Sequence, residues 1–178
     1  IERKQYLNEL IKKKDNGRIK IITGIRRCGK SYLLFEIYKD YLVRTGIKQE
    51  QIIEIALDDI ENLEYRDPFK LNDYIKNKIS EERQCYVFID EIQFSKRVKN
   101  PYSQDSDEDI SFVDVLLSLM KRKNIDIYVS GSNSRMLSKN ILTQFRDRGD
   151  EIHVHPLSFA ELCQCYEDKN NAWQDYVV

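Results

Sequence analysis

The stretch Gly24-Ile25-Arg26-Arg27-Cys28-Gly29-Lys30-Ser31 joins two different sequence patterns. Before it, the β-branched run at 19–23 predicts a buried strand, and after it the apolar residues of 33–42 recur at helical spacing. A strand, a glycine-containing loop and a helix in this order aim consecutive backbone amides at one point in front of the helix. This part of the chain therefore predicts the first strand-loop-helix unit of an α/β fold, with an anion site on it.

The loop has the pattern G-x-x-x-x-G-K-S, and each fixed position has a chemical reason. The two glycines let the backbone wrap closely around phosphate oxygens. Lys30 would reach the β- and γ-phosphates, and the Ser31 hydroxyl would ligate Mg²⁺. The predicted nucleotide-binding residues are Gly24, Ile25, Arg26, Arg27, Cys28, Gly29, Lys30, Ser31 and Tyr32.

Four further runs predict strands, at 52–57, 85–89, 125–129 and 151–155. The run at 85–89 is apolar without alternation, as expected for a parallel strand with helices on both faces. Helical patterns alternate with the strands along the chain. This order predicts a three-layer α/β/α sandwich with a mainly parallel sheet, which is the arrangement of P-loop NTPases.

Asp90 and Glu91 follow the third predicted strand directly. The carboxyl ends of parallel strands form the edge of the sheet at which open α/β folds bind ligands. Asp90 would hold Mg²⁺, directly or through a water molecule, and Glu91 would polarise the attacking water. Acidic residues often simply end a strand, but a carboxylate pair combined with a Gly-Lys-Ser loop favours nucleotide hydrolysis.

Ser130-Gly131-Ser132-Asn133 follows the fourth predicted strand. If this strand lies beside the first or the third strand, the hydroxyl and amide groups of this segment face the γ-phosphate, and one of them could orient the water or sense the loss of phosphate. The alternative is that these small polar residues only form a turn and cap a helix at Ser134. Both interpretations stay open.

An arginine could stabilise the charge of a phosphoryl-transfer transition state. Arg135, Arg146 and Arg148 follow the predicted sensor, and each could act in its own chain or on a neighbouring subunit. Surface arginine is the commoner explanation for each of them taken singly.

The 178 residues carry 29 basic and 30 acidic side chains, so the net charge is −1, with 41% hydrophobic and 33% charged residues. This balance predicts a globular chain and excludes a chain-wide polycationic nucleic-acid binder. No apolar run approaches the roughly 18 residues of a membrane span, and no signal peptide precedes the helical pattern at 2–14. We therefore expect a cytoplasmic protein without membrane association. The start at Ile1 and the end at Val178 suggest a fragment or a processed chain.

Four cysteines without a secretory signal predict reduced thiols. Cys163 and Cys165 follow His153 and His155 closely, so a small metal site is conceivable there, although the ligand spacing is irregular. Within the polar stretch 95–109, the acidic cluster at 105–109 predicts a solvated loop rather than a metal loop.

Four motifs together resemble the AAA+-superfamily ATPases of bacteria and archaea whose N-terminal ATPase domain is followed by a domain of unknown function. The motifs are the loop at 24–31, Phe88-Ile89-Asp90-Glu91-Ile92-Gln93, Tyr128-Val129-Ser130-Gly131-Ser132-Asn133-Ser134 and Pro156-Leu157-Ser158-Phe159-Ala160-Glu161. The resemblance covers nearly the whole chain. It implies a central strand before the loop, with Lys30 and Ser31 on nucleotide and Mg²⁺. It also implies Asp90 and Glu91 as Walker B residues and a sensor at Ser132 or Asn133.

The resemblance further implies an ATPase domain at 1–160, with 1–17 forming a helix packed on it, and the start of a largely absent C-terminal region at 161–178. The family usually has Gly-Arg before the last strand. Here the matching run is Arg146-Asp147-Arg148-Gly149, with Asp147 at the place of the glycine. This match makes Arg148 the candidate arginine finger.

These observations predict ATP binding and Mg²⁺-dependent ATP hydrolysis that drives or gates an attached module. Lys30, Glu91 and Arg148 are the predicted catalytic residues, and Ser31 and Asp90 the predicted Mg²⁺ ligands. A nucleotide-gated interaction module with little turnover of its own is the alternative, and a P-loop kinase for a small substrate is a third. A DNA or protein partner that acts through the C-terminal region, a homo-oligomer, and the choice between adenine and guanine stay open.

Overall fold

A computed structural model describes residues 1–103, 108–132, 145 and 148–165 of the chain. Five strands form one sheet in which all neighbouring pairs are parallel, in the order β2-β3-β6-β1-β7. The strands are β1 (Ile19–Thr23), β2 (Ile52–Ala56), β3 (Cys85–Asp90), β6 (Ile125–Ser130) and β7 (Gly149–His153). The predicted parallel α/β fold is confirmed.

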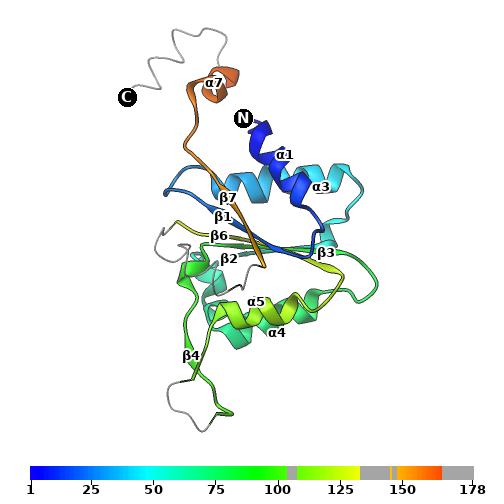
Figure 1. Cartoon of the computed structure of the whole chain (residues 1–178), viewed down its shortest axis with the longest axis vertical. Helices are drawn as coiled ribbons and strands as arrows, with labels where there is room; N and C mark the ends of the chain where they lie inside the picture. Colours follow the sequence, from blue (N-terminus) through cyan, green and yellow to red (C-terminus); the bar gives the residue numbers. More distant parts are fainter. Residues whose placement is uncertain (104–107, 133–144, 146–147, 166–178) are drawn as a thin grey trace.

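Helices cover both faces of the sheet, so the molecule has three layers (Figure 1). One face carries α1 (Lys4–Lys13) and one long continuous helix. This long helix consists of α2 (Lys30–Tyr32), the π-helical η1 (Leu33–Tyr38) and α3 (Lys39–Arg44). The other face carries α4 (Pro68–Lys78) and α5 (Phe112–Leu119). The short helical segments are η2 (Gln49–Gln51), η3 (Ile60–Arg66), η4 (Ile92–Phe94), α7 (Phe159–Leu162) and η5 (Cys163–Cys165).

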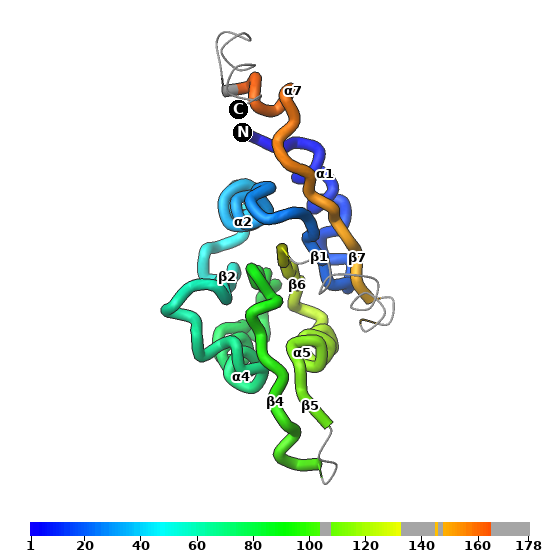
Figure 2. Tube along the Cα trace, turned by 90° about the vertical axis from the view of Figure 1, so that its left-hand side faces the viewer, coloured from blue at the N-terminus to red at the C-terminus, as the bar shows by residue number. Residues whose placement is uncertain are grey.

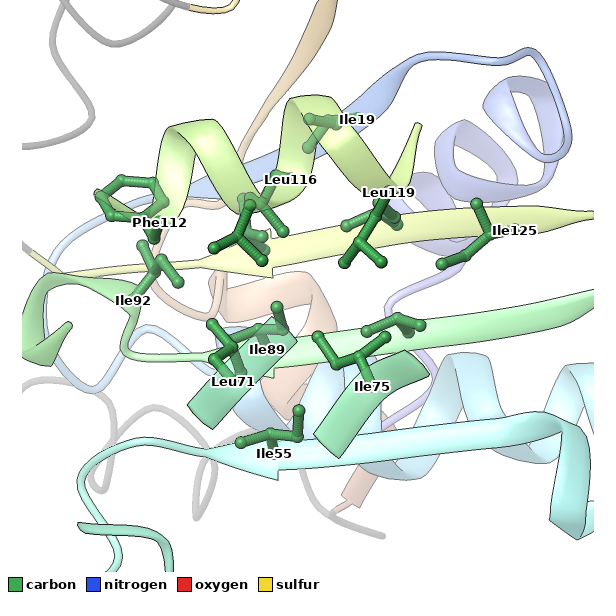
Figure 3. Packing of buried hydrophobic residues seen from close by; sticks show 14 of the residues in the cluster. Ile19, Ile55, Leu71, Ile75, Ile89, Ile92, Phe112, Leu116, Leu119 and Ile125 are labelled. Atoms are coloured by element: carbon green, nitrogen blue, oxygen red, sulfur yellow. The ribbon is translucent and has the colours of Figure 1, made fainter. Parts of the chain in front are cut away.

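Two hydrophobic cores follow from the alternation of side chains along each strand. In β3, Cys85, Val87 and Ile89 face α4 and α5, whereas Tyr86 and Phe88 face the helices on the opposite side. Figure 3 shows the first core, in which Leu71 and Ile75 of α4 and Leu116 and Leu119 of α5 pack against the sheet. All six residues of β3 are buried, because helices cover both of its faces.

The sheet order decides which loops meet. Strand β1, which precedes the glycine loop, is an interior strand between β6 and β7, and the middle strand of the five is β6. Strand β6 lies between β1 and β3 and pairs with both. Because the strands are parallel, the segments that follow β1, β3 and β6 leave the sheet at one edge. The glycine loop, Asp90–Glu91 and Ser130–Ser132 therefore share that edge.

The polar stretch at 95–109 contains a short hairpin, and residues 105–107 of its acidic cluster lie outside the described part of the chain. β4 (Val98–Lys99) pairs antiparallel with β5 (Asp109–Ile110), and this hairpin extends away from the sheet beyond α4 (Figure 2). Two residues in each strand are too few to produce an alternating pattern, so the sequence carried no signal for it. In the described parts of the chain, no helix has the length and apolar character to cross a membrane.

Candidate functional site

Two glycines shape the loop between β1 and α2. Gly24 has φ +145°, and a Cβ atom there would lie 2.2 Å from the carbonyl oxygen of Val154. Gly29, directly before α2, has φ +90°, a left-handed conformation that side chains disfavour. The loop therefore needs glycine at both positions, once for space and once for conformation.

Lys30 begins α2 and is buried, with 4% of its surface exposed. Its ammonium donates to the carbonyl oxygens of Gly24 and Ile25, at 3.1 and 3.0 Å. Among the described residues, no carboxylate lies within ion-pair distance of it. A buried cation without an anion costs free energy, so the loop is built to receive negative charge.

Asp90 ends β3 and is also buried, with 3% of its surface exposed. Its carboxylate accepts hydrogen bonds from the hydroxyls of Ser130 in β6 and Ser31 in α2. Burial raises the pKa of Asp90, the two hydroxyls oppose this rise, and the charge of Glu91 adds to it. The contact between Ser31 and Asp90 joins the glycine loop to the end of β3, so the two predicted Mg²⁺ ligands are neighbours.

Glu91 leaves the sheet in a left-handed backbone conformation, with φ 52° and ψ 48°. Its carboxylate accepts hydrogen bonds from the Ser132 hydroxyl, at 2.9 Å, and from the Gln93 side-chain amide. Gln93 also donates to the Ser132 hydroxyl at 3.0 Å, so the three side chains form a closed triangle. A left-handed non-glycine residue is strained by about 1–3 kcal/mol and is typical of functional sites.

Of the predicted sensors, Ser132 is described and lies against Glu91, whereas Asn133 lies outside the described residues. Ser130 is fully buried and contacts Asp90. The end of β6 and the residues after it therefore position the carboxylate of Asp90, which ends β3, and that of Glu91, which follows it.

Arg148, the candidate finger, does not lie at this edge in its own chain. Its carbonyl oxygen accepts a hydrogen bond from the amide of Ile19, the first residue of β1. The glycine loop begins at the other end of that strand, about 13 Å away at the usual rise per residue. Arg135 and Arg146 lie outside the described residues.

A cavity of about 290 Å³ borders the glycine loop on its outer side. Arg27, Cys28 and Gly29 line it from the loop, and Tyr32 lines it from α2. Ile1, Arg3 and Leu157 close it from the two ends of the described chain. The exposed loop residues Ile25, Arg26 and Arg27 and the half-exposed Tyr32 leave this side of the loop accessible.

Two residues of the site were not among the predicted ones. Gln93 follows the carboxylate pair in the sequence, and its contact with Glu91 depends on the turn of η4. Arg3, which hydrogen-bonds to the carbonyl oxygen of Cys28 in the loop, is 25 residues away from it in sequence. No local pattern reveals such a contact.

The conceivable metal site near the C-terminal cysteines has no support in the described residues. Among them, no group of three His, Cys, Asp or Glu side chains could hold a metal ion. His153 instead hydrogen-bonds to the Thr23 hydroxyl at 2.9 Å and packs edge-on against His155. The side chain of Cys165 lies outside the described part.

A parallel sheet with a glycine loop after one interior strand and a carboxylate at the end of another defines a P-loop NTPase fold. The sequence model of the family described as "AAA domain" matches residues 16–163. The chain therefore belongs to the AAA domain family, a group of P-loop ATPase-like proteins. This confirms the family that the four motifs indicated.

Two proteins with no assigned function are similar to most of the chain. One from Haemophilus influenzae is 35% identical over 163 residues, which are 91% of this chain and 37% of that protein. MJ1544 of Methanocaldococcus jannaschii is 30% identical over 150 residues, 82% of this chain and 28% of that protein. The chain thus spans only about a third of the length of these relatives.

Solved structures with low sequence identity have the same fold. Yeast Hsp104 in its casein complex has a TM-score of 0.59 at 14% identity, over 99% of this chain and 30% of that chain. PCH-2 of C. elegans has a TM-score of 0.56 at 16% identity, over 90% of this chain and 44% of that chain. A DNA polymerase III gamma subunit-related protein of Thermotoga maritima has a TM-score of 0.56 at 15% identity, over 96% of this chain and 57% of that chain. They support the fold class alone.

Proposed function

We propose that the protein binds ATP with Mg²⁺ and hydrolyses it to ADP and phosphate. The observation that carries the proposal is a pair of buried opposite charges at one edge of the sheet. Among the described residues, Lys30 has no anion and Asp90 has no cation within ion-pair distance, and Ser31 joins their two elements. A Mg²⁺-bound triphosphate supplies what each charge lacks, a phosphate for the ammonium and a cation for the carboxylate.

The donor set of this site fits Mg²⁺. The Ser31 hydroxyl and the Asp90 carboxylate offer adjacent oxygen ligands, which Mg²⁺ prefers to nitrogen or sulfur. When bound, the ion would neutralise the charge that develops on the phosphates. Ser130 would hold the Asp90 carboxylate in place, because its hydroxyl donates to that group.

Glu91 is the proposed general base. It would accept a proton from the water molecule that attacks the γ-phosphorus, while Lys30 and the loop amides stabilise the phosphate charge. Ser132 would keep the carboxylate oriented, since its hydroxyl donates to it at 2.9 Å. The base of the nucleotide would lie in the cavity of about 290 Å³ beside Cys28 and Tyr32.

Turnover of ATP and of GTP, with and without DNA, tests this proposal. Lys30→Ala should abolish nucleotide binding, whereas Glu91→Gln should bind ATP without hydrolysing it. Lys70→Ala and Glu82→Gln make the same chemical changes at exposed positions and serve as matched controls. Unchanged turnover in Glu91→Gln would remove Glu91 from its role, and unchanged binding in Lys30→Ala would contradict the whole site.

A nucleotide-gated interaction module is the second candidate, and the triangle at Glu91 favours it. Gln93 and Ser132 both donate to the carboxylate that should activate water. Both hydrogen bonds end on the same carboxylate oxygen, Oε2, so this oxygen is already occupied and would have to release them to accept a proton from water. Slow turnover that rises sharply with DNA or on self-association would support this candidate over an autonomous ATPase.

The wider context is proposed from the sequence. Residues 1–160 would form the ATPase domain, residues 161–178 would begin a C-terminal region, and that region would contact a DNA or protein partner. Reduced cysteines fit a cytoplasmic protein, and Cys28 and Cys85 are buried free thiols. A homo-oligomer would bring Arg148 of one copy to the site of another.

A further inference from the structure

Arg3 connects three segments that are far apart in the sequence. Its guanidinium donates to the carbonyl oxygen of Cys28 at 2.5 Å, to that of His155 at 2.6 Å, and to the carboxylate of Glu161 at 3.1 Å. The side chain is buried, with 2% of its surface exposed, and it stacks on the Tyr6 ring at 4.6 Å. One side chain thus ties the N-terminus to the glycine loop and to α7, which lie together in Figure 2.

This arrangement has a cost. Arg3 adopts a left-handed backbone conformation, with φ 45° and ψ 46°, which is unfavourable for a residue with a side chain. Its charge is removed from water and pairs with the carboxylate of Glu161. Strained and buried charged residues persist where the surrounding contacts require them.

The contact with Cys28 determines how the next amide points. In a trans peptide the C=O and N–H bonds point in opposite directions, and the described residues contain no cis peptide. With the Cys28 carbonyl directed to Arg3, the Gly29 amide of the same peptide is directed away from Arg3. Among the described residues, nothing accepts a hydrogen bond from that amide. The Gly29 amide is therefore a free donor, oriented by Arg3.

Glu161 links this orientation to α7. It accepts hydrogen bonds from the Ser158 amide and hydroxyl as well as from Arg3. Partial burial opposes ionisation, but the Ser158 groups and the Arg3 guanidinium together lower the pKa of Glu161. The carboxylate is therefore charged at neutral pH and holds Arg3 between α7 and the glycine loop.

We propose that Arg3 is a positioning residue for phosphate binding. It fixes the Cys28–Gly29 peptide so that the Gly29 amide faces the phosphates, and through Glu161 it makes this orientation depend on the docking of α7. The inference rests on the proposed nucleotide site and adds a residue that touches no phosphate itself. It also makes phosphate affinity sensitive to α7.

Titration of ADP and of inorganic pyrophosphate into the wild-type chain and its variants tests this inference. Pyrophosphate has no base, so it reports on the loop amides without the cavity that Arg3 also borders. Arg3→Met should weaken binding of both probes about tenfold or more, because the peptide is free to rotate. Arg3→Lys should have an intermediate effect, since one ammonium cannot hold three separated acceptors. Glu161→Gln should weaken binding by about two- to fivefold, because it keeps the Cys28 contact but loses the charge pair.

The NMR resonance of the Gly29 amide distinguishes a positioning role of Arg3 from a merely structural one. In the wild type it should shift on pyrophosphate binding, and in Arg3→Met this shift should be reduced while the thermal unfolding remains cooperative. Lys4→Met, an exposed neighbour, is the matched control and should bind both probes as tightly as the wild type.

If Arg3→Met does not fold, the variants Glu161→Gln and Arg3→Lys provide the test instead. Wild-type affinity and an unchanged Gly29 shift in the folded variants would overturn the inference. A wild-type chain that binds neither probe would instead overturn the proposed function, and the inference with it.

Discussion

Lys30 and Asp90 each hold a buried charge that has no opposite charge beside it among the described residues. For Asp90 this has a measurable consequence, because burial raises the pKa of its carboxyl above the ordinary value of 3.8. A carboxyl with a raised pKa in the folded state binds its proton more readily there than in the unfolded chain. Stability therefore rises as the pH falls through the folded pKa, and the charged form is a cost at neutral pH.

Asp90→Asn should accordingly stabilise the nucleotide-free protein at pH 7. Urea unfolding of the wild type and the variant should give a difference that shrinks as the pH falls toward and below the folded pKa of Asp90. Asp73→Asn, on the exposed side of α4, is the control and should leave the unfolding free energy nearly unchanged. A less stable Asp90→Asn variant would show that the carboxylate is stabilised in the free protein, against our account.

At position 24 a side chain is excluded by lack of space and not only by the backbone φ angle. In Gly24→Ala the new Cβ would lie 2.2 Å from the backbone carbonyl oxygen of Val154, which cannot move without shifting the exit of β7. Gly46→Ala provides the matched control, because φ there is +96° and nothing lies within 4 Å of the new Cβ. Thermal unfolding should give a loss of about 1–2 kcal/mol for Gly46→Ala, from the backbone strain alone. Gly24→Ala should lose clearly more, and equal losses would contradict the close approach.

At the scale of the elements, a buried ion pair joins β1 to β6 at the edge of the sheet opposite to the site. Lys20 donates to Asp126, and both are almost fully buried. Asp126 also accepts from the Tyr128 hydroxyl at 2.7 Å and from the Asp15 amide at 2.9 Å. Burial lowers the pKa of Lys20, and the charge of Asp126 opposes this change.

Asp126→Ala should therefore destabilise the fold strongly, by about 3–5 kcal/mol, because it leaves the Lys20 charge buried and unpaired. Glu50→Ala removes one partner of an exposed pair, in which Glu50 is 65% and Arg83 50% exposed. It should cost no more than about 1 kcal/mol. Denaturant unfolding at neutral pH compares the two variants, and similar losses would mean that the buried pair contributes little.

The sequence predicted those elements that carry long patterns. Four of the five strands coincide closely with apolar runs, because a buried parallel strand must be apolar on both faces. The fifth was expected at 151–155 and is found at Gly149–His153, since an edge strand with exposed residues has a weak pattern. The π-helical η1 and the short hairpin of β4 and β5 depend on tertiary packing, which no local pattern records.

For the site, local motifs predicted that Lys30, Ser31 and Asp90 would come together. The sequence could not show that Gln93 closes on Glu91 or that Arg3 contacts Cys28. These contacts depend on one turn of backbone and on chain segments that meet only after folding.

For the whole molecule, the position of Arg148 bears on whether several copies assemble around the nucleotide site. It lies at the edge of the sheet opposite to the loop, so it would act as a finger only on the site of a second copy. Arg148→Ala should then lower turnover by about 10³-fold with little change in nucleotide affinity. Mixing Arg148→Ala with Glu91→Gln chains should restore part of the activity, because some sites in mixed assemblies would be intact. Full turnover of Arg148→Ala alone would exclude this role.

We propose that the glycine loop and the end of β3 form one site for a Mg²⁺-bound nucleotide. Calorimetric titration of ADP with and without Mg²⁺, into the wild type and Asp90→Asn, tests it most directly. We expect Mg²⁺ to tighten ADP binding to the wild type at least about tenfold, and Asp90→Asn to bind metal-free ADP normally while losing this gain. If the variant keeps the full Mg²⁺ dependence, Asp90 does not hold the ion and the account is wrong.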